Sequence, residues 1–371
     1  MSDWFAISKL SDKVSLLFNE MRTLLWTLGA RQNEINFKVQ ELFAIKDNTV
    51  KILKLLQEQQ EQSTKIQSLN KTKEIQHNTD ISSITELNNS RVATGDKDGY
   101  ISLFAVDDEK EQWTKLKEEK GHDSCITSLF ELSKNILVTS SFDKTLKVWN
   151  IDDDDTLTPI QTLEGHNGGV CQVIPLTNDT IASGSLDCTI KIWNINTCKE
   201  EVPPLTEDFR IYSLLKLKNK DQMVVGGQGT SVSFWNTKTF MKEKSVTCCG
   251  CYSLNGLIEL PNHCIAVNGR SSSTIDIIDT ETYQLIKQIE CGGYINNNNS
   301  YSSLHLLGGG TFIYCHDGYF CQISAITYKV LFKSKMNDEF GGTAITSLSN
   351  EKYFIADNKK KGISVFQINN N

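Results

Sequence analysis

Turn-forming residues are scarce in the first quarter of the chain. Gly29 is the only glycine or proline before Gly95, although the 371 residues contain 23 glycines and 5 prolines. The chain also lacks a long apolar run. None approaches the ~18 residues that a membrane-spanning helix needs, which excludes an integral membrane protein. The first residues show no basic stretch followed by an apolar one, so we expect no secretory signal.

Cysteine usage and charge point to a reducing compartment and away from nucleic acid. The chain has 11 cysteines, an odd number. Without a secretory route, we interpret them as thiols in a reducing compartment. The net charge of −7, from 38 basic and 45 acidic side chains, argues against nucleic acid as the main ligand. We therefore expect a cytoplasmic protein, and a nuclear or cytoskeleton-associated location stays open.

Residues 1–70 show the heptad pattern of a coiled coil. Apolar residues recur in steps of three and four, and Arg31 and Lys38 interrupt the series. The pattern predicts an N-terminal α-helical coiled coil over residues 1–70, ~100 Å long at 1.5 Å per residue. The predicted coiled-coil seam consists of Ile7, Leu10, Val14, Leu17, Met21, Leu24, Leu28, Ile35, Leu42, Ile45, Ile52 and Leu56.

A helix of this kind cannot bury its own apolar stripe. We expect a homo-oligomer or a helical partner through residues 1–70, and the seam leaves open whether the coil is homotypic or heterotypic. The alternative is an amphipathic helix that lies on the core of the neighbouring domain. That arrangement is rare for helices much longer than 25 residues.

The rest of the chain, residues 71–371, repeats about every 42–45 residues. Short alternating runs end in an aromatic residue, with spacings of 45, 44 and 42, at Phe104, Trp149, Trp193 and Trp235. Weaker copies follow near Ile278, Ser324 and Phe366. That makes seven units, each with room for four short strands, and internal repeats of this length are typical of propellers and solenoids.

The first three units share a finer pattern. A histidine stands 21 residues before an aspartate, a serine or threonine stands four before the aspartate, and an aromatic residue stands six after it. The sets are His77, Thr94 and Asp98; His122, Thr139, Asp143 and Trp149; and His166, Ser183, Asp187 and Trp193. Gly-His opens the second and third sets, and Trp-Asn closes them. This pattern resembles the WD40 repeat family over some 300 residues.

The resemblance implies an all-β, seven-bladed WD40-like β-propeller over residues 71–371, preceded by the α-helical coiled coil. It also implies that each His, Ser/Thr, Asp and Trp set forms a chain of hydrogen bonds that fixes its blade. The last unit lacks a fourth strand, so residues about 72–77 are expected to close the last blade without a free sheet edge. Asp208 replaces the histidine of the fourth unit by position, so we expect units four to seven to be held by packing.

Several motifs invite a chemical interpretation, but each fits a structural role better. The His, Ser/Thr and Asp residues resemble an acyl-transfer triad, yet a catalytic set occurs once and lies beside an oxyanion hole. The cysteine run at residues 248–251, with His263 and Cys264 downstream, has poor zinc spacing. The Asp152–Asp155 run lacks the alternating ligands of a calcium loop. We predict no enzyme activity, no metal and no cofactor.

These observations favour a non-catalytic protein–protein interaction scaffold or adaptor. In WD40 proteins the narrow top face commonly binds proteins or peptides, and the residue before each turn aspartate projects there. These residues are Lys97, Phe142 and Leu186 by match, and Gln228 by a weaker alignment. Phe142 and Leu186 make a candidate apolar anchor, and the alternative is that they pack against neighbouring loops.

A second interpretation is a signalling subunit. The layout is similar to that of heterotrimeric G-protein β subunits, which also place a helix before seven blades. Those subunits pair the helix with a small helical partner. The N-terminal helical region of this chain is longer than theirs, and units four to seven diverge from the repeat pattern.

Overall fold

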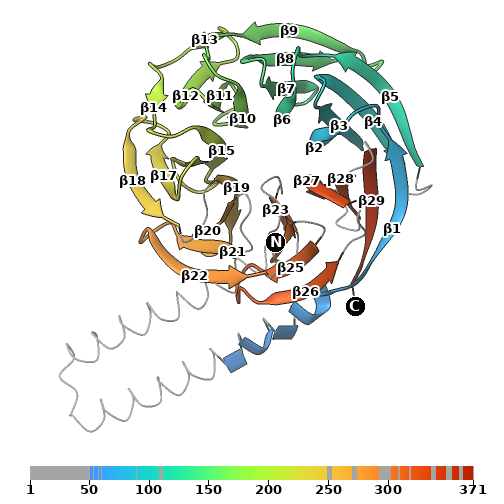
Figure 1. Ribbon diagram of the computed structural model, residues 1–371, viewed down its shortest axis with the longest axis vertical. Helices are drawn as coiled ribbons and strands as arrows, with labels where there is room; N and C mark the ends of the chain where they lie inside the picture. The colour runs from blue at the N-terminus through green and yellow to red at the C-terminus, as the bar shows by residue number, and fades with distance from the viewer. Residues whose placement is uncertain are drawn as a thin grey trace, which may run out of the picture.

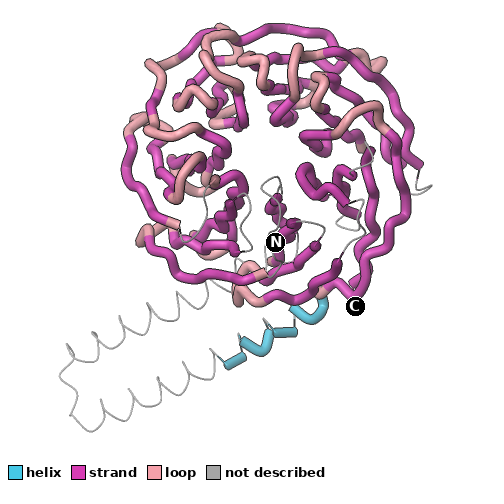
Figure 2. Tube along the Cα trace, in the orientation of Figure 1, coloured by secondary structure: helices cyan, strands magenta, loops and turns pink. Residues whose placement is uncertain are grey.

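The computed structural model describes residues 51–370, apart from residues 53, 57, 60, 89, 108–111, 249–252, 270–273, 292–301, 308–309, 317–318, 336–339, 348–352 and 359–361. In this part of the chain, seven antiparallel sheets stand radially around a central axis, and one short helix leaves the rim (Figures 1 and 2). The fold is a seven-bladed β-propeller, which confirms the predicted all-β class. The seam residues from Ile7 to Ile45 lie outside the described residues.

The blades follow the order of the chain, with the inner strand first. Blade 1 contains β2 (Ile81–Leu87), β3 (Arg91–Asp96), β4 (Tyr100–Asp107) and β5 (Gln112–Lys120). Blade 2 contains β6 (Ile126–Ser133), β7 (Ile136–Ser141), β8 (Leu146–Ile151) and β9 (Leu157–Leu163). Blade 3 contains β10 (Val170–Pro175), β11 (Thr180–Ser185), β12 (Thr189–Asn194) and the two short strands β13 (Lys199–Glu200) and β14 (Leu205–Thr206).

Blades 4 to 7 are four-stranded sheets. Blade 4 contains β15 (Ile211–Lys216), β16 (Gln222–Gly227), β17 (Ser231–Asn236) and β18 (Lys242–Thr247). Blade 5 contains β19 (Leu254–Leu260), β20 (Cys264–Gly269), β21 (Thr274–Asp279) and β22 (Gln284–Glu290). Blade 6 contains β23 (Ser302–Leu307), β24 (Thr311–His316), β25 (Tyr319–Ser324) and β26 (Val330–Lys335). Blade 7 contains β27 (Phe340–Ser347), β28 (Tyr353–Asn358), β29 (Gly362–Asn370) and β1 (Ile66–Gln76).

Each blade is stabilised by apolar burial against its neighbours. The second strands β3, β16 and β20 are buried at every position, because each lies in the middle of a sheet that is covered on both faces. In one core cluster, Trp149 of blade 2 packs with Leu103 of blade 1. Single sheets of this size cannot bury an apolar face alone, so the radial arrangement supplies the core.

Hydrogen bonds tie the inner strands of neighbouring blades together. The Thr127 hydroxyl of blade 2 donates to the carbonyl of Val170 in blade 3 over 2.8 Å. The Ser213 hydroxyl of blade 4 donates to the carbonyl of Leu254 in blade 5 over 3.0 Å. These bonds fix the relative height of adjacent blades around the axis.

The two ends of the described chain meet in blade 7. β1 pairs antiparallel with β29, from Ile66 opposite Asn370 to Gln76 opposite Gly362. Residues 66–70 therefore belong to a strand, in contrast to the helical boundary predicted at residue 70. The reason is burial: Ile66 is 1% exposed and packs with Phe320 and Phe366 in the core between blades 6 and 7.

The short helix lies within residues 51–64 and carries the last two predicted seam residues. Ile52 and Leu56 are 57% and 44% exposed, and Leu55 between them is 63% exposed. No helix among the described residues is long and apolar enough to cross a membrane.

Candidate protein-binding face

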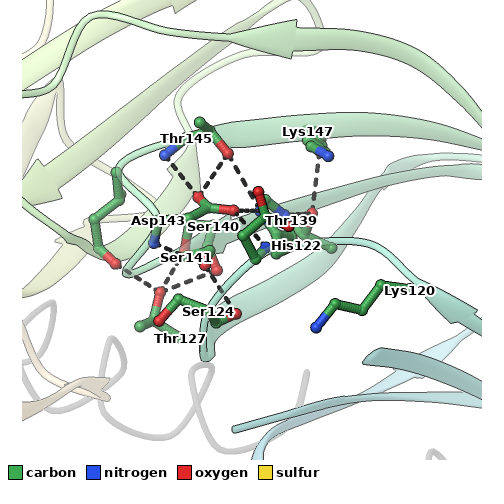
Figure 3. Close-up of polar contacts among 12 residues, drawn as sticks. Lys120, His122, Ser124, Thr127, Thr139, Ser140, Ser141, Asp143, Thr145 and Lys147 are labelled. Carbon is green, nitrogen blue, oxygen red and sulfur yellow. Dashed lines mark hydrogen bonds and ion pairs between the residues drawn. The ribbon is translucent and has the colours of Figure 1, made fainter. Parts of the chain in front are cut away.

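In blade 2, His122, Thr139 and Asp143 of the predicted set lie together (Figure 3), and Trp149, the fourth residue of the set, bonds Thr139. The Trp149 indole donates to Thr139 Oγ1 over 3.0 Å, and Thr139 Oγ1 lies 2.8 Å from His122 Nε2. His122 Nδ1 lies 2.8 Å from Asp143 Oδ2. Asp143 also accepts the backbone N–H and the hydroxyl of Thr145, at 2.9 and 2.7 Å. The chain of bonds therefore runs from the β8 core position to the turn between β7 and β8.

Blade 3 repeats this arrangement. The Trp193 indole donates to Ser183 Oγ over 2.8 Å, Ser183 Oγ lies 2.8 Å from His166 Nε2, and His166 Nδ1 lies 2.9 Å from Asp187 Oδ2. Asp187 also accepts the backbone N–H and the hydroxyl of Thr189. The turn between β11 and β12 is thus fixed in the same way as its counterpart in blade 2.

The histidine of blade 1 does not reach the predicted hydroxyl. His77 Nε2 lies 3.0 Å from Ser102 Oγ instead of bonding to Thr94. Thr94 Oγ1 is buried and has no hydrogen-bond partner in the described structure. The prediction fails because blade 1 has Phe104 at the tryptophan position, and a phenyl ring has no N–H to hold the threonine hydroxyl in the chain of bonds.

The predicted turn aspartate of blade 1 is also wrong. Asp98 is exposed, while Asp96 is 1% exposed and carries out the capping role. Asp96 Oδ1 accepts the backbone N–H groups of Asp98 and Tyr100 at 3.0 and 2.8 Å, and Asp96 Oδ2 accepts the hydroxyl of Thr79 at 2.6 Å. The sequence spacing of the second and third units therefore does not transfer to the first.

Blade 4 is held by a polar contact that the sequence analysis missed. Glu207 Oε1 accepts the Trp235 indole N–H at 2.7 Å, and Glu207 Oε2 pairs with Lys242 Nζ at 2.7 Å. Asp208, which was expected at the histidine position, is exposed. The serine or threonine position holds Val225, so the carboxylate reaches the indole directly. A shift of one residue in the repeat register would have pointed to Glu207.

The hydrogen bonds also set the protonation of these groups. Burial opposes ionisation of Asp187, but the bonds from Thr189 and His166 outweigh it and lower the pKa of Asp187 to about 2. Burial lowers the pKa of His166, although the Asp187 carboxylate opposes that shift. A neutral His166 donates from Nδ1 to the carboxylate and accepts the Ser183 hydroxyl at Nε2.

This geometry serves structure and not acyl transfer. Thr139 and Ser183 are 0% exposed, and His122 is 1% exposed. Each hydroxyl already accepts an indole N–H, and the set occurs in two blades. A substrate carbonyl has no access to either oxygen, so these residues hold turns in place.

The remaining motifs lie at separate places. Cys264 is buried and His263 is half exposed, while Cys249 and Cys251 lie outside the described residues. Among the described residues, no group of three or more His, Cys, Asp or Glu side chains has an arrangement that holds a metal ion. The aspartate run forms a turn, and Asp155 pairs with Arg91 of blade 1 over 2.7 Å, so this loop also links two blades.

The four predicted top-face residues lie in or beside the turns that join the second and third strands of blades 1–4. We call the face that carries these turns the top face. Phe142 follows β7 and is 46% exposed, and Leu186 follows β11 and is half-buried. Lys97 follows β3 and pairs with Asp80 over 2.7 Å. Gln228 follows β16, is exposed, and donates its backbone N–H to a neighbouring carbonyl.

Two glycines join Phe142 and Leu186 into one patch. A β-carbon built on Gly169 would lie 2.8 Å from Cδ1 and 3.1 Å from Cα of Phe142. A β-carbon built on Gly168 would lie 3.0 Å from the carbonyl carbon of Leu186. Only glycine permits both approaches, so the two turns meet across the Gly168–Gly169 segment. We call Phe142, Gly168, Gly169 and Leu186 the blade 2–3 patch.

Two segments of the chain match the family model for the WD domain, G-beta repeat, at residues 113–150 and 157–194. These two segments, residues 113–150 and 157–194, are therefore similar to WD40 repeats. The two matched WD40 segments span most of blades 2 and 3, whose hydrogen-bond sets include tryptophan. WD40 propellers generally serve as scaffolds for protein interactions.

The structural comparison extends the likeness around the ring. A crystal structure of the WD40 β-propeller domain of Doa1 is similar to this chain, with a TM-score of 0.67 and 16% sequence identity. The similarity covers 81% of this chain and 97% of that one. At this identity the likeness concerns the fold alone. A comparison with curated protein sequences gave no significant match.

Proposed function

We propose that this WD40 propeller is a non-catalytic adaptor that binds a protein or peptide through the blade 2–3 patch of its top face. The observation that carries the proposal is Phe142, a large apolar side chain that is 46% exposed although its backbone is fixed. Its N–H donates to the carbonyl of Cys125 over 3.0 Å, and Gly169 contacts it from the next blade. Because its backbone is already held in this way, binding does not have to order this turn.

The size of the patch fits an anchor for one apolar residue of a partner. Covering the exposed half of Phe142 contributes about 1 kcal/mol, since full burial of such a side chain contributes ~1.5–3 kcal/mol. Leu186 adds to this contact from the adjacent turn. Lys97, the predicted basic residue of the top face, is already paired with Asp80, so we expect the face to recognise apolar surface more than charge.

The experiment compares Phe142→Asp with Ile160→Asp in affinity capture by the full chain. Ile160 lies on outer strand β9 of the same blade and is 52% exposed, so it is a matched control away from the top face. We expect Phe142→Asp to remove partners, with at least a tenfold loss of affinity, while Ile160→Asp retains them. Equal melting temperatures exclude unfolding as the cause. Unchanged capture by Phe142→Asp would place the binding site elsewhere.

The G-protein β-like alternative stays open because the helix at residues 51–64 exposes an apolar stripe. That function requires a separate small helical partner on this stripe, and a homo-oligomeric scaffold requires a second copy there. We propose these two assemblies as alternatives. We also propose a cytoplasmic location, which is consistent with free thiols such as Cys264 and Cys321. Mass measurement of the purified full chain, with and without coexpressed cellular partners, separates a lone chain from either assembly.

A further inference from the structure

Two cysteines from neighbouring blades meet in the core between blades 5 and 6. Cys291 directly follows β22, the outer strand of blade 5, and Cys321 lies on β25, the third strand of blade 6. Both are free thiols in one core cluster, where they are 4% and 1% exposed. The Cys321 sulfur lies 4.0 Å from the carbonyl oxygen of Cys291. A hydrogen bond also joins the two thiols, so their sulfur atoms are in contact across the blade boundary.

This contact brings the pair within reach of a disulfide bond. A disulfide requires two cysteines whose sulfur atoms can approach to ~2.05 Å. Cys291 and Cys321 already place their sulfurs together, and each side chain can rotate about its Cα–Cβ bond. The two residues are 30 positions apart in the chain. The bond would therefore link two blades, and not two strands of one hairpin.

A cationic side chain stands beside the pair. Lys333, on β26, donates from Nζ to the Cys291 carbonyl over 2.6 Å, and its Nζ lies 5.1 Å from the centre of the Tyr319 ring. The hydrogen bond from the Cys291 thiol lowers the pKa of Cys321, and the Lys333 ammonium lowers it further although burial opposes both effects. The same hydrogen bond, together with burial, raises the pKa of Cys291. Cys321 is therefore the thiol that ionises, and the thiolate is the nucleophilic form of cysteine.

We propose that Cys291 and Cys321 are a modification site, at which hydrogen peroxide forms a reversible disulfide bond between blades 5 and 6. The Cys321 thiolate attacks one peroxide oxygen, the O–O bond breaks, and the hydroxide that leaves takes up the proton lost by Cys321. The Cys291 thiol then attacks the sulfur of the resulting sulfenic acid, and the S–O bond breaks with loss of a second water. Two thiols and one hydrogen peroxide thus give one disulfide and two waters, and a thiol reductant reverses the reaction.

The surroundings of the pair select the oxidant and define the consequence. Burial shields both sulfurs from bulky oxidants such as glutathione disulfide, whereas hydrogen peroxide is little larger than water. Blades 5 and 6 contain no tryptophan, so they lack the chain of bonds that holds the turns of blades 2 and 3. A covalent bond would join two blades that otherwise depend on packing. This inference does not rest on the proposed top-face function, because the pair lies between other blades.

The test treats the reduced, folded full chain with hydrogen peroxide and follows its intact mass. One disulfide lowers the mass by two hydrogen atoms, and a thiol reductant should restore it. Digestion with pepsin at low pH, where thiol–disulfide exchange is slow, then identifies the linked peptides. We expect the bond between Cys291 and Cys321 to form at least tenfold faster than any other pairing. Cys291→Ala and Cys321→Ala should abolish it, whereas Cys264→Ala, at a buried thiol of the same core cluster, should retain it.

A further variant tests the part played by the cation. Lys333→Gln should slow formation of the disulfide and move the pH dependence of its rate to higher pH. The reason is that loss of the ammonium raises the pKa of Cys321. An effect on packing alone would change the rate without moving its pH dependence.

Two results would overturn the proposal. One is a folded chain that keeps both thiols free in peroxide while partly exposed thiols such as Cys188 and Cys198 are oxidised. The other is a loss of two hydrogens that persists in Cys321→Ala, which would assign the bond to another pair. Peptide mapping of the wild type needs no substitution, so the test remains valid if an alanine disturbs the core. Melting temperatures of the reduced variants show whether each one retains the fold.

Discussion

The same substitution at equivalent positions of two blades should have opposite effects on stability. Thr94 and Thr139 occupy the hydroxyl position of blades 1 and 2, and both are 0% exposed. Thr139 Oγ1 bonds both His122 and Trp149, whereas Thr94 Oγ1 has no partner in the described part of the chain. We expect Thr94→Val to stabilise the propeller and Thr139→Val to destabilise it.

The size of each change in the free energy of unfolding follows from the hydrogen bonds that the threonine makes. Valine keeps the volume of threonine and removes a hydroxyl, and a buried polar group without a partner costs ~1–3 kcal/mol. Thr94→Val should therefore raise the free energy of unfolding by about 1 kcal/mol. Thr139→Val leaves both His122 Nε2 and the Trp149 indole N–H without their partner, so it should lower that free energy by about 2–4 kcal/mol.

Urea and thermal unfolding of the two variants and the wild type provide the measurement. For a domain of this size, 1 kcal/mol corresponds to about 2 °C in melting temperature, so the variants should differ by about 6 °C or more. Equal destabilisation by both substitutions would refute the reasoning, because it would mean that Thr94 makes an interaction as strong as that of Thr139. The double variant should give the sum of the two effects, since the residues lie in separate sets.

The other predictions concern blades 3 and 4. Trp235→Phe should lower the free energy of unfolding by about 1–3 kcal/mol, since it leaves the Glu207 carboxylate buried without its indole donor. The control, Asp208→Asn at an exposed position, should keep the free energy of unfolding within about 0.5 kcal/mol of wild type. Acidification should lower stability, because the folded-state pKa values of His166 and Asp187 are both below their ordinary values and the unfolded chain then binds more protons. The loss should begin below about pH 6.5, where His166 titrates in the unfolded chain, and continue between about pH 4 and 2 for Asp187. A urea midpoint that rises on acidification would contradict this assignment.

Sequence reasoning performed best where one residue determines one contact. His122 lies in the loop between β5 and β6, Thr139 lies on β7, and Asp143 lies in the turn after β7. The spacing of the three residues therefore reflects the course of the chain through one blade. In blades 2 and 3 the structure brings such residues within 3 Å of one another. The seven units could also be predicted from the sequence. An apolar third strand recurs in each unit, including the units that lack the polar residues of the pattern.

Blades 1 and 4 show why the same spacing fails elsewhere. The chain of bonds needs an indole N–H at one end and a carboxylate at the other. With Phe104 in blade 1, His77 turns to Ser102. With Val225 in blade 4, Glu207 reaches Trp235 without an intermediate hydroxyl. Such substitutions preserve the blade by different contacts, and a fixed sequence template does not anticipate them.

The boundary of the helix was misplaced for a related reason. Ile66 fits both the heptad series and a buried strand position, and local pattern does not choose between them. The strand is chosen by tertiary contacts: Ile66 is buried against Phe320 and Phe366, and Gln322 accepts the Ile66 N–H across 256 residues. Contacts of that sequence separation arise only when the ring closes, so they have no local signature.

Rigidity and the proposed binding site coincide in this propeller. Blades 2 and 3 match the WD40 model, and their turns are held by a tryptophan, a hydroxyl, a histidine and an aspartate in series. The same two turns present Phe142 and Leu186. A turn whose backbone is held by buried hydrogen bonds can keep an apolar side chain exposed. A partner then binds to a preformed surface. Loss of Thr139 should therefore weaken partner binding as well as stability, even at temperatures where the propeller remains folded.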